Sequence, residues 1–308
     1  MPNAPLLDPG EELEHLRLAS TVAGIEADVV LPDHHYLAGG GLRLHYLDWG
    51  TPRRRAIVFL HGGGLTARTW DLVCLNLRTD YRCLALDLRG HGDSDWSAAL
   101  EYGLGAQLGD LQAFTDRLGL DDFLLVGMSL GAMIAIAHAA THSSRLAGLV
   151  AIDAAPPFSL GPGVRRIADF KSRGQFDSVE ELVEHARAFN PRRDPRLLRR
   201  SLLHNIRQGR DGKLTWKYDR RALGLRRIES LVGEFAALTG VEASIKCPVL
   251  IVRGAESDVL SERQADGFAR SLPNGRWTTV ADAGHTVQGD NPRELTSALR
   301  RFMAENKL

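Results

Sequence analysis

The chain has 308 residues, of which 44% are hydrophobic and 25% charged, so it can form one large globular domain with an insertion. Its 38 basic and 38 acidic residues cancel, which argues against a general attraction to nucleic acid or to anionic membranes. No segment is apolar and long enough to span a membrane, the N-terminus lacks a signal-peptide pattern, and the three cysteines are widely spaced. These features predict a cytoplasmic protein with reduced thiols.

Apolar segments with strand character alternate with helix-like segments over most of the chain. Residues 35–37 and 42–47, on either side of three glycines, predict an antiparallel hairpin at a sheet edge. Further strands are expected at residues 56–60, 83–86, 123–126, 149–152, 249–252 and 277–280. The alternation predicts the α/β class, with a mostly parallel sheet and helices on both of its faces.

The alternation breaks between residues 152 and 249, where helix starts replace strand signals. Ser178 and Glu181 have the spacing of a capping box, and Asp194 with Pro195 begins another helix. We therefore predict a helical cap insertion over residues 155–240. The core is assigned to residues 35–154 and 241–308, and residues 1–34 form an N-terminal extension, with a short helix expected near residues 11–18.

A Gly-x-Ser-x-Gly pattern centred on Ser129 follows the predicted strand 123–126 and precedes a helix-forming segment. A sharp strand-to-helix turn of this kind holds a serine hydroxyl clear of the sheet. A Cβ atom at Gly127 or Gly131 would collide with neighbouring backbone, which explains both glycines. The pattern indicates a nucleophile, and the alternative is a loop that is merely tightened by glycine.

A glycine-rich segment, residues 61–64, directly follows the strand 56–60. Backbone without side chains can approach a substrate and offer N–H donors to a developing oxyanion, although a bare turn has the same composition. We predict that Gly63 and Leu130 supply those donors through their N–H groups. His61 is expected to organise the loop rather than to act as a base.

Two ionisable residues follow late strands, at the sheet edge where open α/β proteins build their sites. Asp258 comes after strand 249–252 and His285 after strand 277–280. A base that takes the serine proton and an acid that orients this base complete a serine mechanism, so we predict a triad of Ser129, Asp258 and His285. Asp153, at the end of strand 149–152, is the competing acid; we expect it to be a turn residue at the cap entrance.

Taken together, the segments at residues 61–64, 87–94, 127–131, 254–258 and 283–285 resemble the motifs of the α/β-hydrolase fold family in order and spacing. The resemblance covers nearly all of the chain after residue 35. It implies an eight-stranded sheet, a helical cap, a Ser-Asp-His triad, no cofactor and no metal. His91 and Asp93 resemble a structural turn of the family and are expected to be scaffold.

Capped carboxylesterases and C–C hydrolases of the meta-cleavage type are the most similar branches. Leu130 and Thr286 depart from the C–C hydrolase pattern, and a serine at position 129 disfavours the branches that use an aspartate nucleophile. We therefore expect a carboxylesterase that hydrolyses an ester of a small or medium organic acid through an acyl-enzyme. The alternatives are a C–C hydrolase, a lactonase, and a ligand-binding protein on a hydrolase scaffold.

The expected partners are a small ester and water, without nucleic acid or membrane, and the sequence does not indicate an oligomeric state. Candidate pocket residues are Gly62, Gly64 and Met128 in the core and Phe158, Leu160, Trp216 and Tyr218 in the cap. For the four cap residues, packing within the cap is the alternative role. Five arginines lie at 192, 193, 196, 199 and 200. Their spacing distributes charge around a helix, which favours a solvated face over a carboxylate clamp, so we expect neutral esters to be hydrolysed at least as well as carboxylate-bearing ones.

Overall fold

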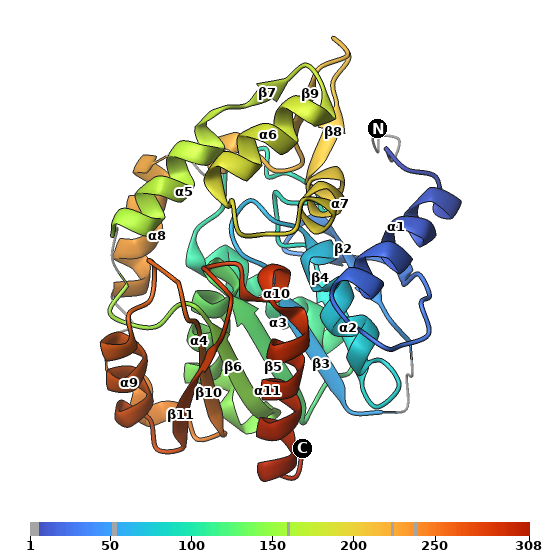
Figure 1. The fold of residues 1–308 in the computed structure, drawn as a ribbon. Coiled ribbons are helices and arrows are strands. Elements are labelled where there is room, and N and C mark those ends of the chain that lie inside the picture. The colour runs from blue at the N-terminus through green and yellow to red at the C-terminus, as the bar shows by residue number, and fades with distance from the viewer. Residues whose placement is uncertain (1–5, 51–53, 159–160, 223–224, 237–239) are drawn as a thin grey trace.

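The computed structural model describes the chain except for residues 1–5, 51–53, 159–160, 223–224 and 237–239. Its centre is an eight-stranded sheet in the order β1-β2-β4-β3-β5-β6-β10-β11 (Figure 1). The strands are β1 Asp33–Gly39, β2 Leu42–Asp48, β3 Ala56–Leu60, β4 Arg82–Leu86, β5 Phe123–Met128, β6 Leu146–Ile152, β10 Val249–Gly254 and β11 Gly275–Val280. β1 and β2 pair antiparallel, as does β2 with β4, and all other pairs are parallel. The predicted mostly parallel sheet of eight strands is confirmed.

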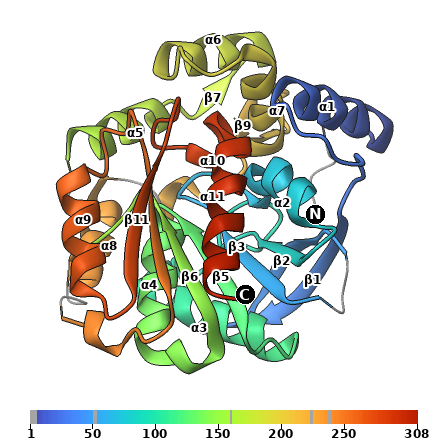
Figure 2. The same cartoon turned by 60° about the horizontal axis from the view of Figure 1, so that its bottom comes forward.

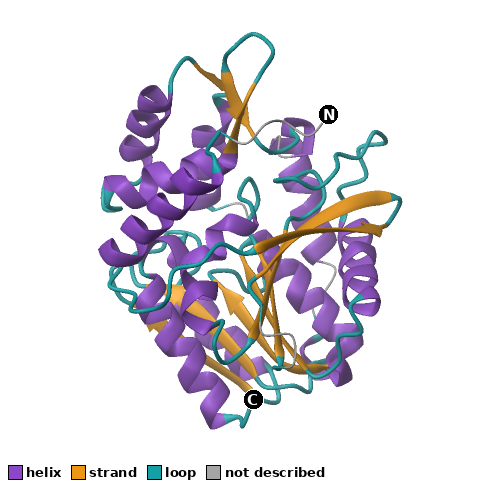
Figure 3. Ribbon diagram, turned by 90° about the vertical axis from the view of Figure 1, so that its right-hand side faces the viewer, coloured by secondary structure: helices purple, strands orange, loops and turns teal. Residues whose placement is uncertain are grey.

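Helices cover both faces of this sheet, as Figures 2 and 3 show. Strand residues alternate between two apolar layers: Val58 and Leu60 lie in one, Ile57 and Phe59 in the other. One layer is completed by α3 Leu104–Arg117, α4 Leu130–His142 and α9 Glu262–Ser271. The opposite layer is completed by α1 Pro9–Val22, α2 Asp71–Leu77 and α11 Pro292–Glu305. The N-terminal helix is longer than expected because Asp8 caps it with a capping box.

The chain between β6 and β10 forms an insertion, called the cap below, which lies over one edge of the sheet (Figure 1). Its helices are α5 Pro162–Ser172, α6 Val179–Phe189, α7 Pro195–Asn205 and α8 Leu225–Ala236. Three short strands, β7 Gln175–Phe176, β8 Ile206–Gln208 and β9 Leu214–Trp216, form a second, antiparallel sheet that the sequence analysis did not predict. Segments of two or three residues are too short to show an alternating pattern.

Short helical segments complete the described structure. A helix, α10 Val287–Asp290, precedes α11, and 3₁₀ turns occupy Ala67–Trp70, Ser143–Arg145, Arg220–Ala222 and Glu242–Ser244. Among the helices of the described residues, none has the length and apolar character needed to cross a membrane.

The turn after β4 joins the cap to the core. Gly92 N–H donates to the carbonyl of Lys217 at 2.8 Å, and the Lys217 ammonium lies 2.7 Å from the carboxylate of Asp93. His91 is buried and pairs as an isolated β-bridge with Tyr218 of the cap. These contacts agree with the expected scaffold role of His91 and Asp93.

Candidate active site

The turn between β5 and α4 presents Ser129 at the edge of the sheet. Ser129 has φ 53° and ψ −116°, a backbone conformation that non-glycine residues rarely adopt. A Cβ at Gly127 would lie 2.2 Å from the carbonyl oxygen of Gly131, and a Cβ at Gly131 would lie 2.3 Å from that of Leu60. The steric explanation for both glycines is confirmed, and the strained turn holds a partly exposed serine at the head of a helix.

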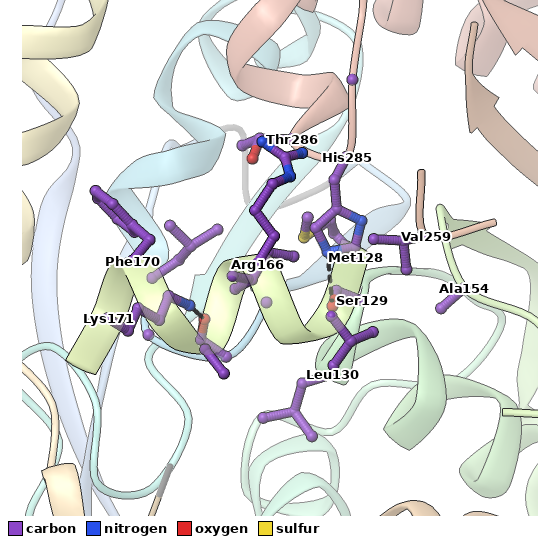
Figure 4. Close-up of a pocket in the computed structure, with 18 of the residues that line it drawn as sticks. Met128, Ser129, Leu130, Ala154, Arg166, Phe170, Lys171, Val259, His285 and Thr286 are labelled. Carbon is purple, nitrogen blue, oxygen red and sulfur yellow. Dashed lines mark hydrogen bonds between the residues drawn. The ribbon is translucent and has the colours of Figure 1, made fainter. Parts of the chain in front are cut away.

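A chain of hydrogen bonds leads from Ser129 into the interior. His285 Nε2 lies 3.0 Å from Ser129 Oγ (Figure 4), and His285 Nδ1 lies 2.7 Å from Asp153 Oδ2. The Asp153 side chain is fully buried, and the His285 side chain is 13% exposed. An ionised Asp153 can only accept, so the imidazole proton resides on Nδ1 and Nε2 accepts from the serine hydroxyl.

Asp153 is held in place from several sides. It follows β6 with φ 51°, a left-handed conformation that aspartate tolerates better than most residues. Besides His285, its carboxylate accepts hydrogen bonds from the Ser257 hydroxyl and from Gly254 N–H at 3.2 Å. A buried charge is expensive unless it is hydrogen-bonded, and these donors meet that need. Ser257 therefore supports the site, a role that no sequence pattern had indicated.

The prediction that Asp258 contacts His285 is wrong. Asp258 Oδ2 forms an ion pair with Arg166 of α5 at 2.9 Å, and its side chain is 41% exposed. The loop after β10 directs Ser257, not Asp258, toward the buried edge of the sheet. Asp153, the competitor expected to be a turn residue, occupies the position beside the imidazole.

The glycine-rich loop after β3 lies against the serine turn. A Cβ at Gly62 would lie 3.3 Å from Ser129 Cβ, and Gly63 and Leu130 line the same pocket as Ser129. Leu130 is the first residue of α4, where N–H groups have no acceptor within the helix and the helix dipole favours negative charge. These positions suit donors to an oxyanion, and that role stays a prediction.

His61 has the organising role that the sequence indicated. It is buried, its Nε2 accepts from Leu88 N–H at 3.0 Å, and its Nδ1 lies 2.8 Å from the carbonyl of Gly62. Burial lowers the pKa of this imidazole, so it is neutral and links the loop after β3 to the turn after β4.

The pocket above Ser129 has a volume of about 250 Å³ and is walled by both core and cap. Of the predicted lining residues, five lie on its wall: Gly62, Gly64, Met128, Phe158 and Trp216. Tyr218 instead is buried between His91 and Trp216, as cap packing. Leu160 lies outside the described residues.

The arginine cluster is only partly the solvated face that we predicted. Arg196 and Arg199 are exposed and pair with Asp194 and Glu180. Arg200 is buried against Asp71, because it lies three residues from each of the buried Leu197 and Leu203 on α7.

The neighbouring arginines of the cluster, Arg192 and Arg193, precede α7 and line the pocket. For Arg193 the expected solvated position is wrong, since its guanidinium lies against Gly289 and its Nε is buried.

One group of side chains has the composition of a metal site. His45, Asp87 and Asp93 bring potential ligand atoms within 4.8 Å of one another. Asp87, however, already accepts from His45 Nδ1 at 2.7 Å and from Ala67 N–H at 2.6 Å, and Asp93 pairs with Lys217. The group is accounted for as a hydrogen-bonded support of the turn after β4.

Comparison with known proteins agrees with this geometry. A family model described as the alpha/beta hydrolase family matches residues 57–298. The chain belongs to the alpha/beta hydrolase family. The esterase Rv0045c of Mycobacterium tuberculosis is 30% identical over 282 residues, covering 88% of this chain and 89% of that protein. A crystal structure of the same esterase has a TM-score of 0.76 and covers 97% of this chain and 99% of its own.

Two further relatives widen the comparison. The 3-hydroxybutyrate-oligomer hydrolase of Cupriavidus necator is 31% identical and covers 84% of this chain and 92% of that protein. The structure of an E-2-(acetamidomethylene)succinate hydrolase has a TM-score of 0.77 over 89% of this chain and 99% of its own. At 21% identity it supports the fold alone. This α/β hydrolase therefore has esterases among its similar relatives.

Proposed function

We propose that this α/β hydrolase is a serine esterase that cleaves esters of small or medium organic acids. The observation that carries the proposal is the hydrogen-bonded series Ser129, His285 and Asp153 at the base of a pocket. A serine hydroxyl needs an adjacent base to become a nucleophile, and the base needs an acid that fixes its tautomer. The similarity to an esterase over most of the chain supports ester hydrolysis.

The first half-reaction forms an acyl-enzyme. Ser129 Oγ attacks the ester carbonyl carbon while its proton passes to His285 Nε2, and Asp153 stabilises the resulting imidazolium. The N–H groups of Gly63 and Leu130 donate hydrogen bonds to the negatively charged oxygen of the tetrahedral intermediate. The C–O bond to the alcohol then breaks, and His285 returns the proton to the departing alkoxide.

The second half-reaction releases the acid. Water gives a proton to His285 Nε2 and attacks the acyl carbon, and a second tetrahedral intermediate forms at the same donors. Its collapse breaks the bond to Ser129 Oγ, which regains the proton from His285. The pocket, at about 250 Å³, suits an acyl or alcohol group of a few to about ten heavy atoms.

A panel of p-nitrophenyl esters of increasing acyl length, together with a lactone and a vinylogous diketone acid, tests this function. Ser129→Ala should lower kcat on the preferred ester on the order of a million-fold while the protein stays folded, because only the nucleophile is lost. Ser201→Ala is the matched control, since Ser201 lines the same pocket and is expected to keep near-normal turnover.

Retention of more than a few per cent of the wild-type rate by folded Ser129→Ala would contradict the proposal. A preference for the diketone acid or the lactone would move the assignment to a C–C hydrolase or a lactonase. Absence of any turnover, with binding retained, would favour a ligand-binding protein.

A further inference from the structure

The described wall of the pocket carries an excess of positive charge. Four cationic side chains line it, namely Lys171, Arg166, Arg192 and Arg193, whereas its only lining carboxylate among the described residues is Asp290. All four cations come from the cap, and the other lining residues are largely apolar. Charges facing a largely apolar cavity interact more strongly with a bound ion than charges on an open surface do.

Two of the four cations already have counter-ions. Arg166 pairs with Asp258 at 2.9 Å and Arg192 with Glu256 at 2.6 Å, and all these side chains are about half exposed. Asp290 is also occupied, since its carboxylate accepts from Gly284 N–H at 3.0 Å and from Asn190 Nδ2 at 3.1 Å. The Asp290 carboxylate keeps its charge, and this charge acts on Arg193. The remaining excess charge therefore belongs to Lys171.

Lys171, in the last turn of α5, donates to the carbonyl of Gly63 (Figure 4). Within the described part of the chain, no carboxylate lies at ion-pair distance from its ammonium. Burial lowers the pKa of Lys171 to about 8, so the group still carries a charge at neutral pH. A single carbonyl satisfies one of its three N–H donors and none of its charge.

The ammonium lies close to the reacting centre. A Cβ at Gly64 would be 2.6 Å from Lys171 Nζ, and two residues earlier in the same loop a Cβ at Gly62 would be 3.3 Å from Ser129 Cβ. The charge therefore borders the glycine loop that lies against Ser129. Arg193, whose Nε is buried, lines the same pocket, but its charge faces the carboxylate charge of Asp290.

We infer that the substrate is an ester whose acid part carries a second, free carboxylate, and that Lys171 is the residue that binds it. This inference rests on the proposed ester hydrolysis and specifies its substrate as the half-ester of a dicarboxylic acid. Such a carboxylate supplies the counter-ion that Lys171 lacks, and a charge-assisted hydrogen bond in a partly buried site is stronger than its neutral equivalent. This inference differs from the expectation from sequence that neutral esters are hydrolysed at least as well, and the experiment below decides between the two.

A series of matched alkyl esters tests the inference. The monoethyl esters of succinate, glutarate and adipate are compared with the same esters in which the free carboxylate is a carboxamide, a neutral group of similar shape. Acid release is followed by chromatography against the uncatalysed rate. We expect the best anionic ester to exceed its amide at least tenfold in kcat/KM, with one chain length preferred because the ammonium and the nucleophile have fixed positions.

Variants of Lys171 separate binding from positioning. Lys171→Met should lower kcat/KM for the anionic ester about 10- to 100-fold, chiefly through KM, and leave the amide within about twofold. Lys171→Arg should retain most of the preference because it retains the charge. Lys213→Met is the matched control: Lys213 is an exposed cap residue paired with Asp177, so this variant should behave as wild type.

Two results would overturn the inference: equal hydrolysis of both esters by the wild type, or an equal loss on both esters in Lys171→Met. The second would make Lys171 a positioning residue for the Gly63 loop. In both cases Ser129-dependent hydrolysis of neutral esters would continue, so the proposed function would stand.

A measurement that needs no turnover completes the test. Ser129→Ala protein should bind the anionic ester at least tenfold more tightly than the amide by calorimetry, and equal binding would overturn the inference.

Discussion

The edge of the central sheet and the wall of the cap differ in whether the chain itself supplies partners for a buried charged side chain. Asp153, at the sheet edge, is fully buried, and three donors of the chain itself satisfy its carboxylate. Lys171, on the cap, has one carbonyl and no carboxylate among the described residues. A site that is complete within the chain suits chemistry common to many substrates, whereas an incomplete one suits recognition of a particular ligand. Changes at the sheet edge should therefore stop all turnover, and changes in the cap should alter the choice of substrate.

The largest effect in the comparison is expected at the acid of the sheet edge. Asp153→Asn should lower kcat about 10⁴-fold on every ester, because the amide cannot fix the imidazole tautomer or stabilise its charged form. Asp258→Asn removes only an exposed ion pair with Arg166 and should keep kcat within about fivefold. Steady-state kinetics on one neutral and one anionic ester measure both variants.

Circular dichroism and thermal unfolding serve as controls for these two variants, since Asp153 is buried. A folded Asp258→Asn protein that is inactive, beside an active Asp153→Asn protein, would restore the original assignment from sequence. A loss in Asp153→Asn that is confined to one ester would contradict the division between sheet edge and cap.

Local sequence signals were sufficient to predict that Ser129 and His285 lie together. Ser129 lies between two glycines whose steric need is visible in five residues, and His285 follows the last strand of an alternating series. The choice between Asp153 and Asp258 was different, because both follow a parallel strand and so reach the same edge. What decides between them is the direction of the loop after β10, which turns Ser257 inward, and no local pattern encodes that direction.

Which basic side chains of the cap face the pocket could not be predicted from sequence either. The spacing of the arginines on and before α7 gives their angles around the helix axis, but whether a given angle meets solvent, Asp71 or the pocket depends on how the cap lies on the core. Lys171 cannot be singled out from sequence, because a single lysine near a helix end is ordinarily solvated. Its significance comes from its contact with a glycine more than a hundred positions earlier.

The smallest predicted effect concerns stability of the core rather than chemistry. His138 of α4 is buried, and burial lowers its pKa to about 4. The unfolded chain takes up a proton below about pH 6.5 while the folded protein does not, so stability is lost as the pH falls from about 6.5 to about 4. At pH 5.5 the loss due to this residue should be about 1.4 kcal/mol relative to neutral pH.

Urea unfolding at pH 7.5 and 5.5 checks this value. His138→Met should reduce the difference between the two pH values by about that amount, whereas the exposed His35→Gln should not change it. An unchanged difference in His138→Met would show that His138 does not contribute to the acid sensitivity.

The central claim is that Ser129, activated by His285 and Asp153, attacks the substrate and carries the acyl group. Paraoxon phosphorylates such an activated serine, and tandem mass spectrometry of the digested protein locates the adduct. The account predicts one diethylphosphoryl group on Ser129, appearing in proportion to the loss of esterase activity, absent from Ser129→Ala and strongly slowed in Asp153→Asn. An adduct at another residue that accompanies the loss of activity, or full activity in protein phosphorylated at Ser129, would contradict it.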